Sequence, residues 1–163
     1  ALNEYLNNYQ KSIPDEHIFF CENSAVNAIL SYFSEQARTF GITYTVSASI
    51  PKHISISETD LSILFGNLLE NAIDACNAQS GEDKKIIVRA KTDDHSLCVT
   101  IDNTFSGSLD IDQEGHFVSS KHEGLGLGTE SIKSIAEKYG GVCQFESNNG
   151  MFYASVMCFK DHA

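Results

Sequence analysis

Positive charge is scarce in this sequence, and long apolar runs are absent. Among its 163 residues, 11 lysines and arginines stand against 22 aspartates and glutamates, so the formal net charge is −11. A negatively charged surface repels a polyphosphate backbone, so we expect no nucleic-acid partner. Any anionic ligand should be held by a local group of residues that attracts it. No stretch approaches the roughly 18 apolar residues of a membrane span, and no signal-peptide pattern opens the chain.

Disulfide and zinc frameworks are missing as well. The five cysteines are dispersed and form no CxxC pair. Such an odd set is typical of reduced, mostly buried thiols in an intracellular protein. The chain is long enough to bury a core in one domain without cross-links. Walker A, HExxH and GxSxG motifs do not occur, which argues against P-loop, zincin and hydrolase-elbow chemistry.

The spacing of apolar residues predicts the order of helices and strands. Helices are expected at residues 1–10, which Pro14 closes off, at 22–41, from 57 to beyond 73, and from about 129 to 139. Strands are expected at residues 42–50, 85–93, 96–103, 142–148 and 152–160. This order predicts an α+β fold, a two-layer sandwich with helices on one face of a mixed, mostly antiparallel sheet.

A polar stripe interrupts the most apolar of these segments. The stretch GNLLENAIDACN places Asn67, Glu70, Asn71 and Asp74 within a narrow arc of a helix, because successive residues advance by about 100°. One interpretation is a solvated face. However, residues 60–78 contain no lysine or arginine, and asparagine is a mediocre helix former. Amide and carboxylate oxygens suit Mg²⁺, which keeps several waters and takes further ligands from phosphate, so the stripe indicates a nucleotide site.

A glycine-rich segment follows a long irregular stretch. Residues 104–121 show little periodicity, and Gly124, Gly126 and Gly128 then precede a helix that begins near Thr129. Glycines allow close backbone approach, and the free N–H groups of a helix start attract phosphate. Because loops this long in compact domains are usually functional or disordered, we interpret the glycines as a phosphate cradle rather than a flexible turn.

Three stretches in this order carry a family resemblance. NLLENAIDA, VTIDNTFSG and GLGLGTESI resemble the N box and the two glycine boxes of the ATP-binding domain of sensor histidine kinases, within the wider family that also holds gyrase-type, Hsp90-type and MutL-type ATPases. The similarity covers about residues 21–159 and is strongest toward the peptide-sensing and virulence-type kinases of Gram-positive bacteria. It implies a Bergerat-type ATP-binding fold, with ATP and Mg²⁺ as cofactors.

The resemblance assigns roles to the polar stripe. By position, Asn71 binds Mg²⁺, Asn67 lies one turn earlier beside the phosphates, and Asp74 belongs to the nucleotide-binding set. Hydrolysing members of the family carry a general-base glutamate at the position of Asn67. An amide has no useful basicity, which favours transfer of the γ-phosphoryl group to a protein acceptor over hydrolysis. Glu70 either orients a group or accepts a proton, or it is a solvated surface acid.

The adenine contact has two candidates at the end of a strand, Asp102 and Asn103. Strand alternation places Asn103 on the face of the bulky Val99 and Ile101, so Asn103 is favoured if that face is the core face. Its amide oxygen can accept from the adenine amino group. The sequence departs from the family nearby, because the glycine expected next is absent and Met151 stands where many members have threonine.

The long irregular stretch is the ATP lid in this comparison. Residues 104–123 would cover the nucleotide, and Gly124, Gly126 and Gly128 would hold its phosphates. Lys121, at the end of an SSK motif that resembles the basic end of the lid, is either a phosphate contact or an exposed lysine.

None of the six histidines lies on an amphipathic helix, so the phosphoacceptor histidine is expected outside this chain. We divide the chain into residues 1–13, the end of a helix from an upstream dimerisation hairpin, and residues 14–163, the catalytic ATP-binding domain. The expected partners are that dimerisation domain and a response regulator, in a homodimeric full-length protein. The fragment is expected to be a cytoplasmic domain of a membrane-bound kinase. Alternatives are a serine kinase of the anti-sigma-factor type and a degenerate nucleotide-binding or interaction module.

Overall fold

The computed structural model describes residues 18–106 and 127–160. Their elements follow in the order α2 (Ser24–Thr39), β1 (Thr43–Ser49), α3 (Glu58–Ala78), β2 (Lys85–Thr92), β3 (Ser96–Thr104), α4 (Leu127–Lys138), β4 (Val142–Asn148) and β5 (Met151–Phe159). Each predicted element within these ranges is therefore confirmed, with bounds that differ by a few residues. The helix predicted at residues 1–10 and the boundary predicted after residue 13 lie outside the described residues.

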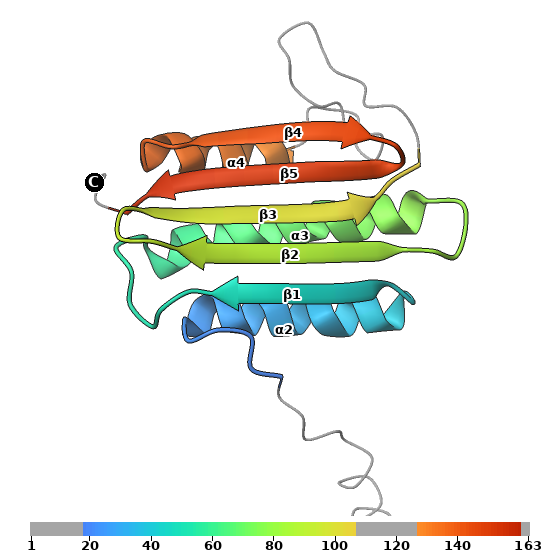
Figure 1. Cartoon of the computed structure of the whole chain (residues 1–163), viewed down its shortest axis with the longest axis horizontal. Coiled ribbons are helices and arrows are strands. Elements are labelled where there is room, and N and C mark those ends of the chain that lie inside the picture. The colour runs from blue at the N-terminus through green and yellow to red at the C-terminus, as the bar shows by residue number, and fades with distance from the viewer. Residues whose placement is uncertain (1–17, 107–126, 161–163) are drawn as a thin grey trace, which may run out of the picture.

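The described strands form one sheet in the order β1-β2-β3-β5-β4. β1 and β2 are parallel, and the other neighbouring pairs are antiparallel. Three helices cover one face of this sheet, with α2 behind β1, α3 behind the centre and α4 behind β4 and β5 (Figure 1). This is the two-layer α+β sandwich that the sequence predicts.

Two side chains start the long helices by capping them. Asn23 Oδ1 accepts a hydrogen bond of 3.1 Å from the Val26 amide at the start of α2. Ser57 Oγ accepts one of 3.1 Å from the Asp60 amide at the start of α3. Such caps satisfy amide groups that the first helical turn leaves unpaired, so each helix begins at a defined residue.

The core lies between the sheet and the helices, and strand alternation decides which residues enter it. On β3, Val99 and Ile101 are buried under α3, whereas Thr100 and Asp102 face the other way and are only half-buried. The buried members of α3 come from its apolar side: Leu61, Leu64, Phe65, Leu68, Leu69, Ala72, Ile73 and Cys76, together with Asp60 at its start. The helix therefore turns its remaining side, with the polar stripe, away from the sheet.

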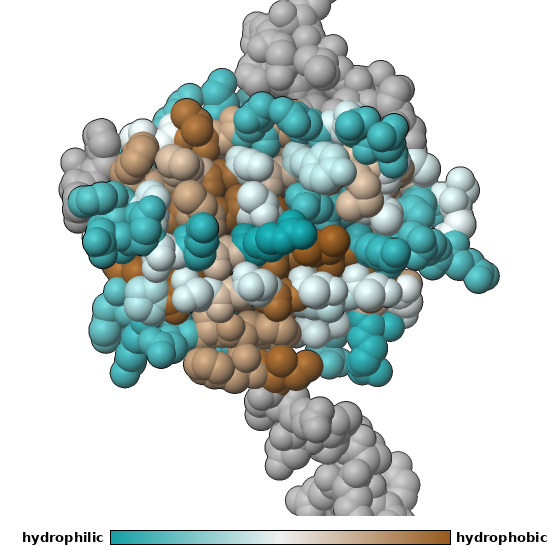
Figure 2. Space-filling view, in the orientation of Figure 1, coloured by the Kyte–Doolittle hydropathy of each residue, from teal (hydrophilic) through white to brown (hydrophobic). Residues whose placement is uncertain are grey.

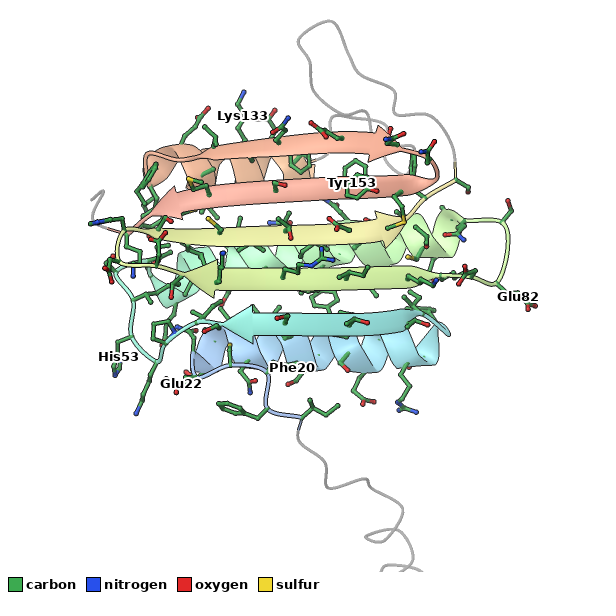
Figure 3. The ribbon with its side chains drawn as sticks, viewed as in Figure 1. Phe20, Glu22, His53, Glu82, Lys133 and Tyr153 are labelled. Carbon is green, nitrogen blue, oxygen red and sulfur yellow. The ribbon has the colours of Figure 1, made fainter. Side chains whose placement is uncertain are left out.

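The opposite face of the sheet carries no helix from the described residues (Figure 1). Figure 2 shows it as mostly hydrophilic, with apolar residues interspersed; the exposed apolar side chains of β4 and β5 are Val142, Met157 and Phe159. Tyr153 lies on β5, while His53 and Glu82 mark connections at opposite ends of the sheet (Figure 3). None of the helices in the described ranges is long and apolar enough to cross a membrane.

All five cysteines are free thiols, in agreement with their dispersed spacing. Cys21, Cys76 and Cys158 are buried, while Cys98 and Cys143 are half-buried. Burial raises the pKa of the Cys158 thiol to about 11, so this group remains protonated at neutral pH. The cysteines of the described residues therefore act as small apolar side chains.

Candidate nucleotide-binding site

The polar stripe of α3 lies on the side of the helix that faces away from the core. Asn67 is half-buried and its Nδ2 donates a hydrogen bond of 2.9 Å to the Ile63 carbonyl. Glu70 and Asn71 are exposed, and Asp74 is half-buried. The bond to Ile63 turns the Asn67 amide so that its Oδ1 points away from its own helix. The stripe is thus an accessible row of amide and carboxylate groups beside a fully packed apolar side.

The start of α4 comes directly against this stripe. A methyl group on Gly128 would lie 3.3 Å from Asn67 Oδ1, and 3.5 and 3.6 Å from Oδ1 and Nδ2 of Asn71. A side chain at Gly128 would therefore crowd Asn67 Oδ1 and come into van der Waals contact with the Asn71 amide. Two motifs that are far apart in the sequence meet at this point. Lys121, Gly124 and Gly126, which the sequence predicts to hold phosphate, lie outside the described residues.

Asn103 brings the third motif to the same end of the molecule. Its side chain is only 2% exposed and shares the helix-covered face with Val99 and Ile101. Nδ2 donates a hydrogen bond of 2.9 Å to the Thr104 carbonyl. A carbonyl can only accept, so this bond fixes the orientation of the amide. The Oδ1 atom accepts no hydrogen bond from any residue that the structure describes, and it is left to accept one from a ligand.

Asp102 lies on the uncovered face of the sheet. Its Oδ2 accepts a hydrogen bond of 2.9 Å from Arg89 Nη1 in an ion pair with that residue of β2. The side chain of Arg89 is 57% exposed, so this pair belongs to the surface. Of the two neighbouring candidates, only Asn103 points toward the helices.

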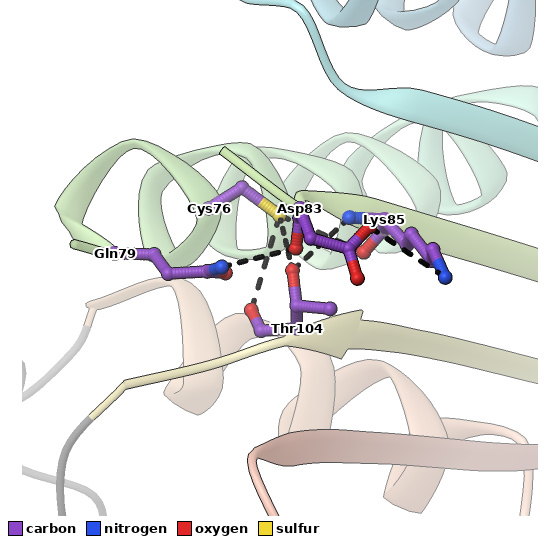
Figure 4. A network of polar contacts seen from close by, with 5 residues as sticks. All are labelled: Cys76, Gln79, Asp83, Lys85 and Thr104. Atoms are coloured by element: carbon purple, nitrogen blue, oxygen red, sulfur yellow. Dashed lines mark hydrogen bonds and ion pairs between the residues drawn. The ribbon is translucent and has the colours of Figure 1, made fainter. Parts of the chain in front are cut away.

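A network of polar contacts fastens α3 to the end of β3 (Figure 4). Cys76 Sγ lies 3.7 Å from Thr104 Oγ1 and 3.6 Å from the Lys85 carbonyl. Thr104 Oγ1 in turn accepts a hydrogen bond of 3.0 Å from the Lys85 amide. At the end of α3, Gln79 Nε2 donates one of 3.0 Å to the Asp83 carbonyl. Desolvation by burial raises the pKa of the Cys76 thiol, which keeps it a neutral donor.

Thr104 shows what sequence reasoning missed at this position. The sequence presents it as a departure, because the family has a glycine after the adenine-binding residue. In the structure its hydroxyl and carbonyl both accept hydrogen bonds, the first from the Lys85 amide and the second from the Asn103 side chain. A glycine at this position would keep the hydrogen bond from the Asn103 side chain to the carbonyl but would lose the one from the Lys85 amide to the hydroxyl. No signal in the sequence connects Thr104 with Cys76 or Lys85, because these contacts depend on how the strands pair.

Aromatic rings line the sheet next to Asn103. Phe152 is opposite Asn103 in the β3–β5 register. The ring of Phe152 is stacked at 6.1 Å from Phe145, and the ring of Phe105 lies 6.1 Å from Phe152 in a tilted arrangement. Such rings provide an apolar wall of the kind against which a flat base can pack. Met151, at the start of β5, pairs with Thr104 and is half-buried.

The donor set fits a nucleotide-bound magnesium ion. The described residues contain no group of three or more histidine, cysteine, aspartate or glutamate side chains that would hold a metal by themselves. They offer instead the amides of Asn67 and Asn71, next to backbone of Gly128 that a side chain would cover. Mg²⁺ commonly takes one or two protein ligands and completes its shell with water and phosphate oxygens. The residues present therefore suit Mg²⁺ that arrives with a polyphosphate.

Solved structures of histidine kinase catalytic domains share this fold. One structure of the catalytic domain of histidine kinase ThkA has a TM-score of 0.65 at 23% identity and covers 85% of this chain and 91% of its own. The mycobacterial sensor histidine kinase MprB has a TM-score of 0.60 at 18% identity and covers 83% of this chain and 96% of its own. The fold that the family resemblance implies is thereby confirmed.

Curated relatives in sequence are sensor proteins. A probable C4-dicarboxylate sensor kinase of Bacillus subtilis (strain 168) is 25% identical over 138 residues, covering 79% of this chain. The C4-dicarboxylate transport sensor protein DctB of Rhizobium meliloti (strain 1021) is 37% identical over 84 residues, covering 50%. The chain spans 25% and 13% of the length of these relatives. The similarity to peptide-sensing and virulence-type kinases in particular stays a prediction.

A family model described as "GHKL domain" matches residues 56–158, which hold α3, the described site residues and the final hairpin. GHKL membership implies that the domain uses a nucleotide, in agreement with the approach of Gly128 to the amides of Asn67 and Asn71. The three sequence motifs, the sheet order and this match agree, and the chain belongs to the GHKL domain family.

Proposed function

We propose that this chain is the ATP-binding catalytic domain of a two-component sensor histidine kinase. In this role it transfers the γ-phosphoryl group of ATP to a histidine located outside residues 1–163. Its family, its fold and the sensor kinases among its relatives support the proposal. The observation that carries it is the approach of Gly128 to Asn67 and Asn71, because this approach unites two separate nucleotide-binding motifs at one point.

Adenine is assigned to Asn103. Its Oδ1 accepts a hydrogen bond from the exocyclic amino group of the base, while the bond from Nδ2 to the Thr104 carbonyl prevents the amide from rotating to offer a donor. Guanine presents a carbonyl oxygen at the equivalent position, where it would face Oδ1 without a hydrogen. The fixed amide therefore selects adenine over guanine. Phe152, across the sheet from Asn103, adds an apolar surface for the base.

The phosphates and the metal are assigned to the α3–α4 contact. Mg²⁺, held by Asn71 together with water and phosphate oxygens, supplies neutralisation of the phosphate charge. Asp74 is assigned to the same nucleotide-binding set, and the phosphate contacts are assigned to Gly124, Gly126, Gly128 and Lys121. The residues of this chain act by holding and aligning the nucleotide, which is what phosphoryl transfer mainly requires of a protein.

Asn67 and Glu70 decide between transfer and hydrolysis. Asn67 is an amide at the position of the general base, and its Nδ2 is already engaged with the Ile63 carbonyl. It does not activate water, so the γ-phosphoryl group is reserved for the acceptor histidine. Glu70 is exposed on the same stripe and is proposed to orient the incoming acceptor or take its proton.

The proposed context of the domain is a larger protein. Residues 1–13 are assigned to the end of a helix from an upstream dimerisation and phosphoacceptor domain, and residues 14–163 to the catalytic domain. The full-length protein is proposed to be a homodimer that passes the phosphoryl group to a response regulator. We assign the domain to the cytoplasmic side of a membrane-bound kinase.

A calorimetric titration tests the nucleotide site. The chain is titrated with a non-hydrolysable ATP analogue, with and without Mg²⁺, as the wild type, as Asn71→Ala and as Asn77→Ala. Asn77 is an exposed amide on the same helix and serves as the matched control. We expect binding that depends on Mg²⁺ in the wild type and in Asn77→Ala, and loss of that dependence in Asn71→Ala.

Other outcomes favour the alternatives. Absence of binding in the wild type would contradict the kinase assignment and favour an interaction module. Binding by the wild type, followed by phosphoryl transfer from ATP to a serine substrate and not to a histidine-containing dimerisation domain, would favour a serine kinase of the anti-sigma-factor type.

A further inference from the structure

A buried polar cluster joins α3 and α4 at the end of the sandwich away from Asn103. Tyr139 is 6% exposed, and its hydroxyl donates a hydrogen bond of 2.5 Å to Asp60 Oδ2. The same hydroxyl accepts one of 3.2 Å from the Ser57 amide. Lys138 Nζ donates a further bond of 2.8 Å to Asp60 Oδ2. Asp60 is 8% exposed, so this carboxylate depends on these partners for compensation of its lost hydration.

The cluster and the nucleotide site are the two ends of one helix pair. α3 and α4 run in opposite directions behind the sheet (Figure 1). Asp60 and Asn71 are about 16 Å apart along α3, at the standard rise of about 1.5 Å per residue, and Gly128 precedes Tyr139, the residue directly after α4, by the same number of residues. Asp60 meets Tyr139 at one end, and Asn71 meets Gly128 at the other. Both contacts therefore require the same axial alignment of the two helices.

The apolar contacts between these helices are less directional than the hydrogen bonds of the cluster. Ile132, Ile135 and Ala136 bury the inner side of α4, and apolar burial is non-directional. A hydrogen bond between a phenol and a carboxylate has strict distance and angle requirements. A rotation or translation of α4 that moves the Tyr139 hydroxyl out of hydrogen-bond range of Asp60 would break this bond. The hydrogen bond between Tyr139 and Asp60 thus limits where Gly128, at the other end of α4, can lie relative to α3.

We propose that Asp60 and Tyr139 are positioning residues for the nucleotide. Their hydrogen bond sets the axial position of α4 on α3, and this position holds the backbone of Gly128 against the amides of Asn67 and Asn71. Neither residue touches the ligand. The inference rests on the proposed nucleotide-binding function. It adds that Asp60 and Tyr139, at the far end of the helix pair, affect the affinity for nucleotide.

The test removes one oxygen atom from the cluster. Tyr139→Phe deletes the hydroxyl and keeps the ring. Tyr44→Phe is the matched control, since it deletes a hydroxyl that donates a hydrogen bond of 3.2 Å from β1 to the Leu30 carbonyl of α2. Both variants and the wild type are titrated with a non-hydrolysable ATP analogue and Mg²⁺, at a temperature where unfolding curves show each protein to be fully folded.

We expect Tyr139→Phe to bind the analogue about tenfold more weakly, because slight misplacement of a binding group is costly, and Tyr44→Phe to match the wild type within about twofold. In ¹⁵N spectra without ligand, the Gly128 amide signal should move in Tyr139→Phe and stay in place in Tyr44→Phe. A purely structural role for Tyr139 would lower the unfolding temperature and leave both readouts unchanged.

The possible failures are distinguishable. A wild type that binds the analogue, together with a Tyr139→Phe variant of equal affinity and an unshifted Gly128 signal, would overturn the positioning role and leave the nucleotide site intact. A wild type that does not bind would overturn the proposed function. In that case a shifted Gly128 signal would still support the alignment, and an unshifted one would contradict it.

Discussion

The two ends of the α3–α4 pair treat polar groups in opposite ways. At the Asp60 end, one carboxylate receives hydrogen bonds from Lys138 and Tyr139 and is shielded from water. At the other end, the Asn71 side chain and Asn103 Oδ1 have no hydrogen-bond partner among the described residues. The Asn71 amide is exposed, so water can solvate it and a ligand can reach it. We call the Asp60 end the satisfied end and the Asn71 end the open end. Under the proposal above, the hydrogen bonds of the satisfied end align the two helices, and nucleotide binding at the open end depends on this alignment.

The largest loss of stability is expected from a substitution at Gly141, next to the satisfied end of the helix pair. Gly141 connects α4 to β4, and a methyl group on it would lie 1.7 Å from the Met157 carbonyl oxygen. Backbone cannot yield that far, so Gly141→Ala should cost about 4 kcal/mol or more of unfolding free energy, or prevent folding. Urea unfolding measures this loss.

Gly66→Ala is the control for Gly141→Ala. Gly66 lies inside α3 with open space around a methyl group, so alanine should stabilise the protein by up to about 1 kcal/mol. Similar stabilities for the two variants would show that the close approach of β5 to Gly141 is wrong.

Substitutions at the open end should lower the affinity for nucleotide rather than the stability of the fold. Asn103→Ala removes the only acceptor assigned to adenine and should weaken binding of an ATP analogue by about tenfold or more. Asp102→Asn, one residue earlier on the opposite face, removes a surface ion pair and should change affinity less than about twofold. Isothermal titration of both variants separates the two faces of β3. A larger loss of affinity in Asp102→Asn would reverse the adenine assignment.

Gly128→Ala and Gly141→Ala introduce the same methyl group at the two ends of the helix pair, and their effects on affinity and stability should differ. Gly128→Ala places this group 3.3 Å from Asn67 Oδ1, so the Asn67 amide must shift and analogue affinity should fall by about tenfold. Stability should stay within about 1 kcal/mol of the wild type or increase, because alanine favours the helix that starts here. Unfolding curves and titrations on the same samples distinguish this result from Gly141→Ala. A loss of stability without a loss of affinity would place Gly128 outside the binding site.

The smallest expected effect is a pH dependence at the satisfied end. Hydrogen bonds from Lys138 and Tyr139 lower the pKa of Asp60 in the folded state. A lowered folded-state pKa contributes stability above the unfolded-state value of about 3.9, and this contribution is lost as the pH falls through the folded-state pKa. Asp60→Asn should therefore be less stable than the wild type by about 1 kcal/mol at pH 7, a modest figure because Lys138 is exposed.

Urea unfolding at pH 7 and pH 3 checks the sign of this effect. The difference in stability between Asp60→Asn and the wild type should narrow at the lower pH, because Asp60 takes up a proton in the unfolded state before it does so in the folded state. A difference that widens toward low pH would contradict the direction of the pKa shift.

Much of the fold was predictable because local patterns specify it. Apolar periodicity identified α3 and β3, and Ser57 marked the helix start. The polar stripe was equally predictable, since residues one turn apart on a helix must share a face. Its meaning as a site came from the order of three motifs. The contacts of Thr104 were not predictable, because they depend on pairing with Lys85 of another strand.

By itself, the sequence determined the order of helices and strands, the amide row on α3 and the glycine entry to α4. These are local features, set by residue spacing and by the conformational freedom of single residues. Only the tertiary structure decided that Asn103 and not Asp102 turns toward the helices, that Gly128 meets Asn71, and that Asp60 pairs with Tyr139. Each of these features depends on residues that are distant in sequence, because strand pairing and the arrangement of α3 and α4 on the sheet bring those residues together.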